Sequence, residues 1–441
     1  MTYRPPDPGD STDAAVGESS SVLYIPDDLI FKILARLPAK SVIRLRSVYK
    51  AWLAMTSTRR FVDAHLEFSK ARPPTTLVLP REYHVGGERN GRKKTAFWIG
   101  LYKYNGGDVA ELVHDELLPA GVAPWAPPLH CDGLILSYTR ELDIMVCNPA
   151  TKEFVSLPKG IERETIRETV GFGRDPSTNM FKVARYFFER KHGIDNTYSS
   201  RFEVLTLGTC NNPVWRRIAG PPHWIDVSVP GFHSRGFIYR GVEPRSHHKV
   251  LVSFSLADET FSEMPYPPGA PGVESYLCLL ELEGELCAAF IAKPCEAAEI
   301  WTWDNTDLPA WKHRCTIPLP KETIRVNPSG RLRHPKLNFL GKDLQIIGDH
   351  KLYRYSIETG EIKKADVAIE ELWYFHPEKK VYHACSRKEV VFHTVNYVES
   401  LVKIRGHNSS LTQRVVSVLA RIFVRTWNLI TNGWAEFGRY E

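Results

Sequence analysis

Three groups of residues in this sequence could carry binding or redox chemistry, and each also fits a structural role. Gly171-Phe172-Gly173 could cradle a phosphate, but it lacks the third glycine and the strand-then-helix context of a dinucleotide site, so we interpret these residues as turn glycines. His247-His248 could ligate a metal, yet no thiolate or carboxylate stands at ligand spacing, which favours a solvated loop. His383 and Cys385 would share one face of a strand, where core packing is a simpler interpretation than a thiol–imidazole pair.

The remaining reactive or aromatic residues do not combine into a catalytic site. Trp301, Trp303 and Trp311 suit the core of a β-structure, although they could also form a wall on which a ligand stacks. No serine, histidine and acid can be joined into a triad from the sequence. The eight cysteines include no CxxC pair, which predicts reduced core thiols. We therefore predict no catalytic residues, no metal site and no cofactor.

Length, composition and charge limit the class of protein. A chain of 441 residues that is 43% hydrophobic should contain at least two folded units. A net charge of +6 from 57 basic and 51 acidic residues gives no dominant basic field, which argues against nucleic acid as the partner. No apolar run is long enough to span a bilayer, so a membrane is not expected and the protein should be cytoplasmic, nuclear or both. Residues 1–20 have almost nothing to bury and should be a disordered leader.

Residues 75–404 have the texture of a large all-β domain. Short apolar runs alternate with turn residues, and one pattern recurs: an apolar strand, a polar turn and a second strand ending at Pro or a charge. Clear copies occur at 146–158, 255–265 and 355–364, and weaker ones at 205–218 and 300–317. Repetition favours a β-propeller of roughly six to eight blades. A large irregular β-sandwich is the alternative.

A compact helical segment precedes this domain, at about residues 21–70. Pro26 and the acidic pair that follows it suit a helix start. Leu29, Ile33 and Leu37 then recur at intervals of four residues, which makes one apolar face. A second helix should begin near Ser41. So small a unit has more apolar surface than it can hide, so a partner should cover part of it. On these residues alone, a helix-in-groove partner site and a helix-turn-helix DNA reader both stay open.

A family resemblance separates these two possibilities. Residues 25–42 and their continuation, 44–52, closely resemble the F-box: an acidic pair, Leu, Ile-Leu, Arg-Leu-Pro, Lys-Ser, Arg, Val and Trp follow one another in the family's order. Ile25 and Tyr49 depart from the pattern, replacing a leucine and a cysteine. The match is dense over about 45 residues and leaves little room for the DNA reader.

The β-domain also resembles a family. Residues 170–183 look like the signature strand–turn–strand of plant F-box-associated domains, and 131–135 and 147–152 fit the same family's opening repeat. The resemblance is clear from Leu129 to Pro268. It implies a kelch-like β-propeller that binds a protein substrate.

Together these resemblances imply an α+β multidomain protein: a small N-terminal F-box, an all-β propeller-like domain and a C-terminal helix. Its expected role is the non-catalytic substrate receptor of a Skp–cullin–F-box ubiquitin ligase, with a Skp-family adaptor and, through it, a cullin as partners. An enzyme or small-ligand-binding protein that uses the propeller mouth is the alternative. The adaptor-binding residues implied by the resemblance are Ile25, Pro26, Leu29, Ile33, Leu34, Leu37, Pro38, Val42, Leu45, Val48 and Trp52.

The last segment of the chain is not explained by either resemblance. Ser410 and Gln413 form a capping-box pattern that would start a helix over about residues 410–432. Seven of eight positions on one helical face are apolar, and Arg414, Arg421 and Arg425 fall on the opposite side. An amphipathic helix of this kind must cover its apolar stripe against this protein, a partner or a membrane surface.

Overall fold

The computed structural model describes residues 25–404, apart from positions 74, 80–81, 90–91, 119–120, 124–125, 140, 161–164, 191–197, 209–212, 244–248, 269–275, 292–295, 307–308, 324, 327–331, 334, 349–350, 365–368 and 385–392. The predicted leader (1–20), the C-terminal helix (410–432), His247-His248 and Cys385 therefore lie outside the described residues.

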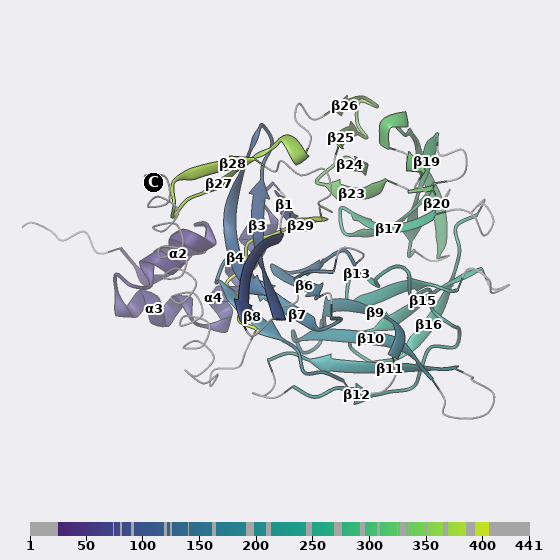
Figure 1. The fold of residues 1–441 in the computed structure, drawn as a ribbon, viewed down its shortest axis with the longest axis horizontal. Helices are drawn as coiled ribbons and strands as arrows, with labels where there is room; N and C mark the ends of the chain where they lie inside the picture. Colours follow the sequence, from purple (N-terminus) through teal and green to yellow (C-terminus); the bar gives the residue numbers. More distant parts are fainter. Residues whose placement is uncertain are drawn as a thin grey trace, which may run out of the picture.

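The N-terminal unit, here called the head, contains four helices (Figure 1). They are α1 (Asp27–Ala35), α2 (Ala39–Leu45), α3 (Lys50–Thr56) and α4 (Arg59–Lys70). Helix α1 begins directly after Pro26 with its two aspartates in the first turn, as predicted. Helix α2 begins at Ala39 instead of near Ser41, because Pro38 takes the N-cap position with φ −58° and ψ 147°.

The rest of the described chain forms a six-bladed β-propeller, which confirms the propeller and excludes the sandwich. Five blades, B to F, are four-stranded antiparallel sheets of consecutive strands. Blade B has β5 (Leu129–Cys131), β6 (Leu134–Tyr138), β7 (Ile144–Asn148) and β8 (Glu153–Ser156). Blade C has β9 (Thr165–Arg174), β10 (Phe181–Arg190), β11 (Tyr198–Thr206) and β12 (Arg216–Arg217). Blade D has β13 (Phe232–Ser234), β14 (Phe237–Gly241), β15 (Val250–Ser255) and β16 (Phe261–Pro265).

The next two blades repeat the arrangement. Blade E has β17 (Tyr276–Leu282), β18 (Glu285–Ile291), β19 (Ala297–Asp304) and β20 (Ala310–Pro318). Blade F has β23 (Lys336–Leu340), β24 (Asp343–Gly348), β25 (Lys351–Ser356) and β26 (Ile362–Lys364). Between these two blades lie the short strands β21 (Arg325–Val326) and β22 (Leu332–Arg333) and a 3-10 turn, η1 (Lys321–Thr323); a second such turn, η2 (Ile369–Glu371), follows blade F.

Blade A closes the ring, because both ends of the propeller contribute to it. From the N-terminal side come β1 (Thr75–Leu79), β2 (Glu82–Arg89), β3 (Arg92–Tyr104) and β4 (Val109–Leu118). From the C-terminal side come β27 (Trp373–His376), β28 (Val381–Ala384) and β29 (His393–Tyr397). Strand β29 pairs antiparallel with β1, and β27 pairs parallel with β4, so the two ends are joined by backbone hydrogen bonds on both sides of the blade.

The recurring sequence pattern marks the outer hairpin of each blade from B to F. Its copies coincide with β7–β8, β11–β12, β15–β16, β19–β20 and β25–β26. In three of the turns, the residue four positions after the end of the first strand has positive φ. These residues are Lys152 (57°), Glu259 (55°) and Gly360 (71°). Blade A is not among these five copies, although its outer hairpin β27–β28 also turns through a residue of positive φ, Lys380 (52°).

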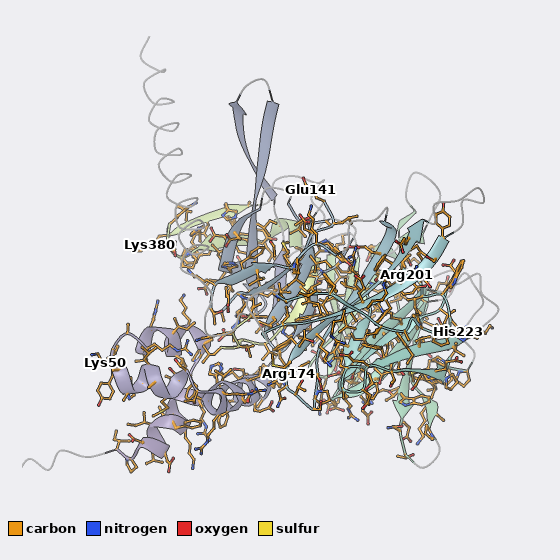
Figure 2. The ribbon with its side chains drawn as sticks, turned by 90° about the horizontal axis from the view of Figure 1, so that it is seen from below. Lys50, Glu141, Arg174, Arg201, His223 and Lys380 are labelled. Carbon is orange, nitrogen blue, oxygen red and sulfur yellow. The ribbon has the colours of Figure 1, made fainter. Side chains whose placement is uncertain are left out.

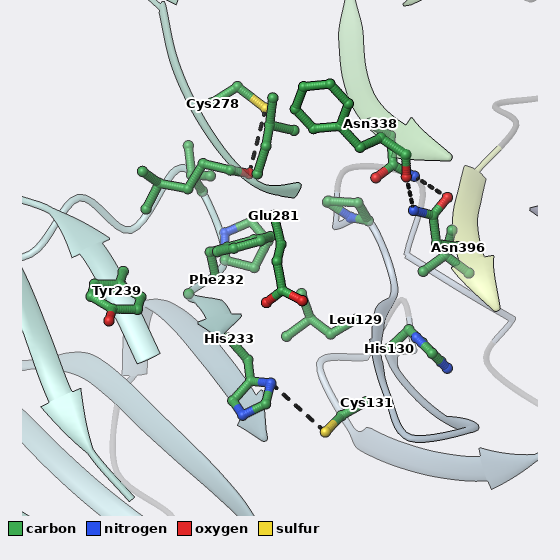
Figure 3. A pocket seen from close by; sticks show the side chains of 18 of the residues that line it. Leu129, His130, Cys131, Phe232, His233, Tyr239, Cys278, Glu281, Asn338 and Asn396 are labelled. Atoms are coloured by element: carbon green, nitrogen blue, oxygen red, sulfur yellow. Dashed lines mark hydrogen bonds between the residues drawn. The ribbon is translucent and has the colours of Figure 1, made fainter. Parts of the chain in front are cut away.

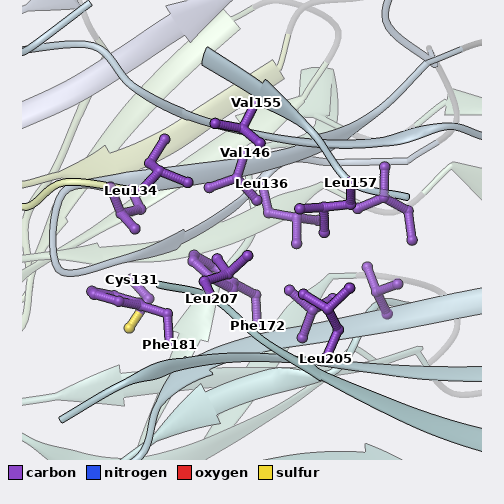
Figure 4. Packing of buried hydrophobic residues seen from close by; sticks show 14 of the residues in the cluster. Cys131, Leu134, Leu136, Val146, Val155, Leu157, Phe172, Phe181, Leu205 and Leu207 are labelled. Carbon is purple, nitrogen blue, oxygen red and sulfur yellow. The ribbon is translucent and has the colours of Figure 1, made fainter. Parts of the chain in front are cut away.

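Packing between neighbouring blades forms the core. Between blades B and C, apolar side chains of β6, β7 and β8 meet those of β9, β10 and β11, with Leu134, Val146, Val183 and Leu205 fully buried (Figure 4). Trp311 is buried between blades D and E, as predicted, and Trp301 and Trp303 pack half-buried against the same cluster.

The interpretation of Gly171 and Gly173 as turn residues is wrong. Both lie inside β9, the innermost strand of blade C. A Cβ atom on Gly171 would clash with Ile238, and one on Gly173 would clash with His233, both from blade D. The glycines are required because the innermost parts of two blades approach each other closely there.

Candidate adaptor interface and propeller channel

The head leaves a set of large apolar side chains exposed. On one side, Leu29 and Ile33 are 50% and 54% exposed one turn apart on α1, and Ile25 precedes them. Val48 and Tyr49, just before α3, and Leu53 within it are exposed as well. We call these six residues the exposed head face. A folded unit this small rarely leaves so much apolar surface uncovered unless a partner covers it.

The eleven residues implied as adaptor contacts separate into three groups. Ile25, Pro26, Leu29, Ile33, Pro38 and Val48 are exposed, and Leu37, Leu45 and Trp52 are half-buried. Leu34 and Val42 are 3% and 0% exposed, because they form the head's own core with Phe61 of α4. We correct the prediction for Leu34 and Val42 on this ground and treat them as core residues.

Sequence reasoning missed two residues of the exposed head face. Tyr49 was noted only as a departure from the F-box pattern, and Leu53 was not singled out. A signal was present, because Leu53 follows Tyr49 by four residues and so falls on the same side of α3. The Tyr49 ring also packs edge-on against Trp52, with 6.0 Å between ring centroids.

The head is packed against the propeller rather than tethered beside it. Leu401, which follows the last propeller strand, is 1% exposed within the head's core, and Ala150 of the β7–β8 turn packs there too. The backbone N–H of Ala39 donates to Glu399 Oε2 at 3.0 Å, and Lys103 of β3 pairs with Glu399 Oε1 at 3.1 Å. Burial alone would raise the pKa of Glu399, but Lys103 and the Ala39 N–H outweigh it and hold that pKa below its usual value.

A network of four charged residues forms a second connection between head and propeller, called here the junction cluster. Arg174 at the end of β9 reaches Asp63 of α4 at 2.8 Å and Asp132 of the β5–β6 turn at 3.1 Å. Lys70 at the end of α4 reaches Asp132 at 3.0 Å. Figure 2 shows Arg174 at the border between head and propeller, whereas Lys50 lies on the outer side of the head.

The environment of Asp132 shows that this cluster is favourable. Burial would raise the pKa of its carboxyl group, but Lys70 and Arg174 outweigh burial, and the pKa lies below its usual value. The Asp132 and Arg174 side chains are only 14% and 15% exposed, so solvent screens this pair less than a surface ion pair. The orientation of the head on the propeller is therefore fixed by apolar packing, a capped helix end and partly buried ion pairs.

A cavity of about 1600 Å³, called here the channel, lies between the innermost strands of the propeller. Its wall is of mixed character. Figure 3 shows the Glu281 carboxylate of β17 projecting toward the middle, near Leu129 and Phe232. On the opposite wall, Asn338 donates to Asn396 at 2.6 Å, which links blade F to blade A. Lys70 and Glu67 of α4 line the rim on the head's side, so the head borders one mouth of the channel.

One cysteine and one histidine meet at this rim. Cys131 Sγ lies 3.8 Å from His233 Nδ1 (Figure 3). Burial raises the pKa of the Cys131 thiol well above its ordinary value and lowers the pKa of His233 to about 4. At neutral pH the pair is therefore an uncharged thiol beside an uncharged imidazole. This is the opposite of a thiolate–imidazolium nucleophile, in which the thiol pKa is lowered.

Among the other candidate residues, His383 has a structural role. His383 contacts the Tyr102 hydroxyl at 3.1 Å inside blade A, as core packing would require. In the described ranges, no three His, Cys, Asp or Glu side chains gather closely enough to hold a metal ion. Of the helices in the part of the chain that the structure describes, none combines the length and apolar character needed to cross a membrane.

Both parts of this chain are similar in sequence to known protein families. The F-box domain family matches residues 22–63, and the F-box associated beta propeller domain family matches residues 125–333. Putative F-box protein At3g52320 of Arabidopsis thaliana is 25% identical over 353 residues, covering 77% of this chain and 86% of that protein. F-box protein At1g30790 of the same plant is 25% identical and covers 86% of this chain and 98% of its own length. F-box protein At1g53790, also from this plant, is 31% identical over 56% of this chain and 54% of its own length.

Proposed function

We propose that this chain, an F-box protein with an F-box-associated β-propeller domain, is the substrate receptor of a Skp–cullin–F-box ubiquitin ligase. The head would bind a Skp-family adaptor and through it a cullin, and the propeller would bind a protein substrate, in the cytoplasm, the nucleus or both. The observation that supports this most strongly is the exposed head face, which presents six apolar side chains on a unit that the propeller holds in place.

The exposed head face has enough apolar surface to support an interface. Fully burying one large aliphatic side chain stabilises a complex by about 1.5–3 kcal/mol. Each residue of the exposed head face is about half exposed, so burying that half contributes about 1 kcal/mol. Six such residues contribute roughly 6 kcal/mol before the cost of association is subtracted. This is sufficient for a specific complex once polar contacts at the rim are added.

The receptor needs no catalytic group of its own. Ubiquitin transfer is accelerated when the substrate is held near the charged conjugating enzyme, which is an effect of proximity. The junction cluster and Glu399 support this mechanism, because they fix the direction from the exposed head face to the propeller channel. The neutral state of Cys131 and His233 speaks against the alternative of an enzyme that uses a thiol nucleophile in the propeller.

The substrate is read by turns at a mouth of the channel rather than by strand cores. Strand residues in the blades are committed to packing, whereas turns can vary without loss of the fold. Val229 and Glu243 are suitable probes, because both lie in loops, just before β13 and just after β14, and line the cavity. A small molecule that binds in the channel remains the second candidate, since Glu281 offers it a carboxylate.

Co-precipitation from plant cells tests both halves of the proposal. The Leu29→Asp/Ile33→Asp variant should lose adaptor and cullin together while still capturing substrate. The Val229→Asp/Glu243→Arg variant should keep adaptor and cullin and lose substrates that accumulate when the proteasome is blocked. Val214→Asp is the matched control, since Val214 is 71% exposed, precedes β12 of blade C and does not line the cavity. Adaptor recovery at the wild-type level with the first variant would refute the proposed role of the head.

A further inference from the structure

The outer hairpin of blade A has one buried and one uncovered side. Trp373 and Phe375 are two residues apart in β27, so they share a side, and Tyr382 stands opposite Phe375 in β28. The rings of Phe375 and Tyr382 lie 4.7 Å apart, while Trp373 and Tyr382 remain 47% and 57% exposed. We call these three residues the hairpin face. Among the residues that the structure describes, nothing covers it.

The other side of the same hairpin shows what a covered side looks like. Tyr374 is fully buried and packs edge-on against Tyr102, with 4.8 Å between ring centroids. On the uncovered side, Val109 of β4 extends the hairpin face, since it stands beside Trp373 in the parallel pairing and is 37% exposed. Four neighbouring apolar residues are thus left accessible on an outer hairpin, where single exposed apolar residues would be ordinary.

The described chain ends close to this hairpin. Glu378, in the β27–β28 turn, pairs with Lys152 at 3.4 Å. The next residue, Glu153, accepts a hydrogen bond from the backbone N–H of Ile404 at 3.0 Å. Ile404 is the last described residue. The remaining chain therefore starts from a residue bound to Glu153, the neighbour in sequence of Lys152, which pairs with the hairpin turn. On the other side of β27, an ion pair of 3.7 Å joins Lys40 of α2 to Glu111 of β4, which stands beside Phe375 in the parallel pairing.

The remaining chain has the length and pattern to cover the hairpin face. Residues 405–409 can span up to about 17 Å when extended. Residues 410–432 would then make a helix of about 34 Å, longer than the roughly 13 Å of a four-residue strand. Its apolar stripe consists of Val415, Val418, Leu419, Ile422, Phe423, Trp427 and Ile430.

We propose that residues 410–432 form an amphipathic helix whose apolar stripe docks on the hairpin face of the same chain. The docked helix fills the corner between blade A, the β7–β8 turn and the head, so the C-terminal segment is a structural part of the receptor. This inference does not depend on adaptor or substrate binding. A second copy of the chain, another protein or a membrane are the other possible occupants, and the test distinguishes them.

Hydrogen–deuterium exchange on the purified full-length chain measures the docking directly. Amides of residues 414–430 should exchange at least about ten-fold more slowly than in the free peptide of the same sequence, because an isolated helix of this length is marginal in water. The Trp373→Ala/Tyr382→Ala variant should lose this protection, and so should Phe423→Asp. The latter changes only the tail and cannot unfold the propeller by removing one of its contacts.

The control is Trp224→Ala, which removes an exposed tryptophan from the connection between blades C and D and should leave the tail protected. Three results would overturn the proposal. In the first, tail amides of the full-length protein exchange as fast as those of the free peptide. If anionic vesicles then restore protection, the occupant is a membrane and the proposal is equally overturned. Protection could persist in the Trp373→Ala/Tyr382→Ala variant. It could also vanish on dilution of the wild-type protein, which would assign the contact to a second copy.

Discussion

The Arg174→Ala substitution should loosen the head from the propeller without unfolding either. It removes a charge-assisted hydrogen bond to Asp63 at 2.8 Å and another to Asp132 at 3.1 Å. Hydrogen bonds to charged groups contribute about 1.5–3 kcal/mol each. Asp63 is 39% exposed, so solvent screening reduces the contribution of its hydrogen bond. Asp132 is 14% exposed and would keep Lys70 as its ion-pair partner after the substitution. We expect a total loss of about 2–4 kcal/mol.

Native-state hydrogen exchange in α4 is the suitable assay, because it reports local opening when the whole chain does not unfold in two states. A loss of 2–4 kcal/mol corresponds to roughly 30-fold to several-hundred-fold faster exchange of the protected amides of α4. Lys40→Ala is the matched control, since its ion pair to Glu111 also joins head and propeller but is 63% and 58% exposed at 3.7 Å. It should change exchange by less than about three-fold. Equal effects of the two substitutions would refute the account of the junction cluster.

Three further predictions follow from buried groups. Asn148→Ala should lower the melting temperature by several degrees, because the Asn148 amide donates to the carbonyls of Ser400 at 3.0 Å and Val402 at 2.8 Å and both would lose a partner; an unchanged melting temperature in a scan would contradict this. Cys131 should resist alkylation by iodoacetamide at pH 8 in the native protein, since burial raises its thiol pKa, and rapid labelling seen by mass spectrometry would disprove the neutral pair. The pKa values of Asp132 and Glu399 are lowered in the folded protein. Their contribution to stability is therefore complete above the unfolded pKa values near 4 and is lost as the pH falls through the lowered pKa values. Asp132→Asn should flatten the fall of the melting temperature at acid pH, and a pH profile identical to that of the wild type would count against the assignment.

Local sequence patterns predicted much of the fold. The acidic pair after Pro26 marked the start of α1, because first-turn carboxylates and proline have the same effect in any context. The strand–turn–strand copies marked five outer hairpins, and in three of their turns the same position has positive φ, at Lys152, Glu259 and Gly360. Blade A could not be recognised from the sequence, since its strands β4 and β27 lie far apart in the chain and pair only through ring closure. Pairing over such a distance leaves no period in the sequence.

The site was less predictable than the fold, for a physical reason. The family resemblance placed Leu34 with Leu29 and Ile33 in one set of contacts, but helix packing turns Leu34 inward and leaves the other two outward. The junction cluster could not be anticipated, because Lys70, Asp132 and Arg174 lie far apart in the sequence and meet through tertiary packing. The inner-strand glycines were misplaced in turns for the same reason, since the approach of blade D that requires them is not encoded locally.

The central claim is that the exposed head face binds a Skp-family adaptor. Its most direct test is the equilibrium affinity of the purified full-length chain for a purified adaptor, measured by calorimetry for the wild type and for Leu29→Asp/Ile33→Asp. Both side chains are about half exposed in the free chain, so the substitutions should leave the fold intact and place two charges in a desolvated interface. We predict a loss of several kcal/mol, which is a drop in affinity of at least about a hundred-fold. Equal affinities of the two proteins for the adaptor would contradict the account.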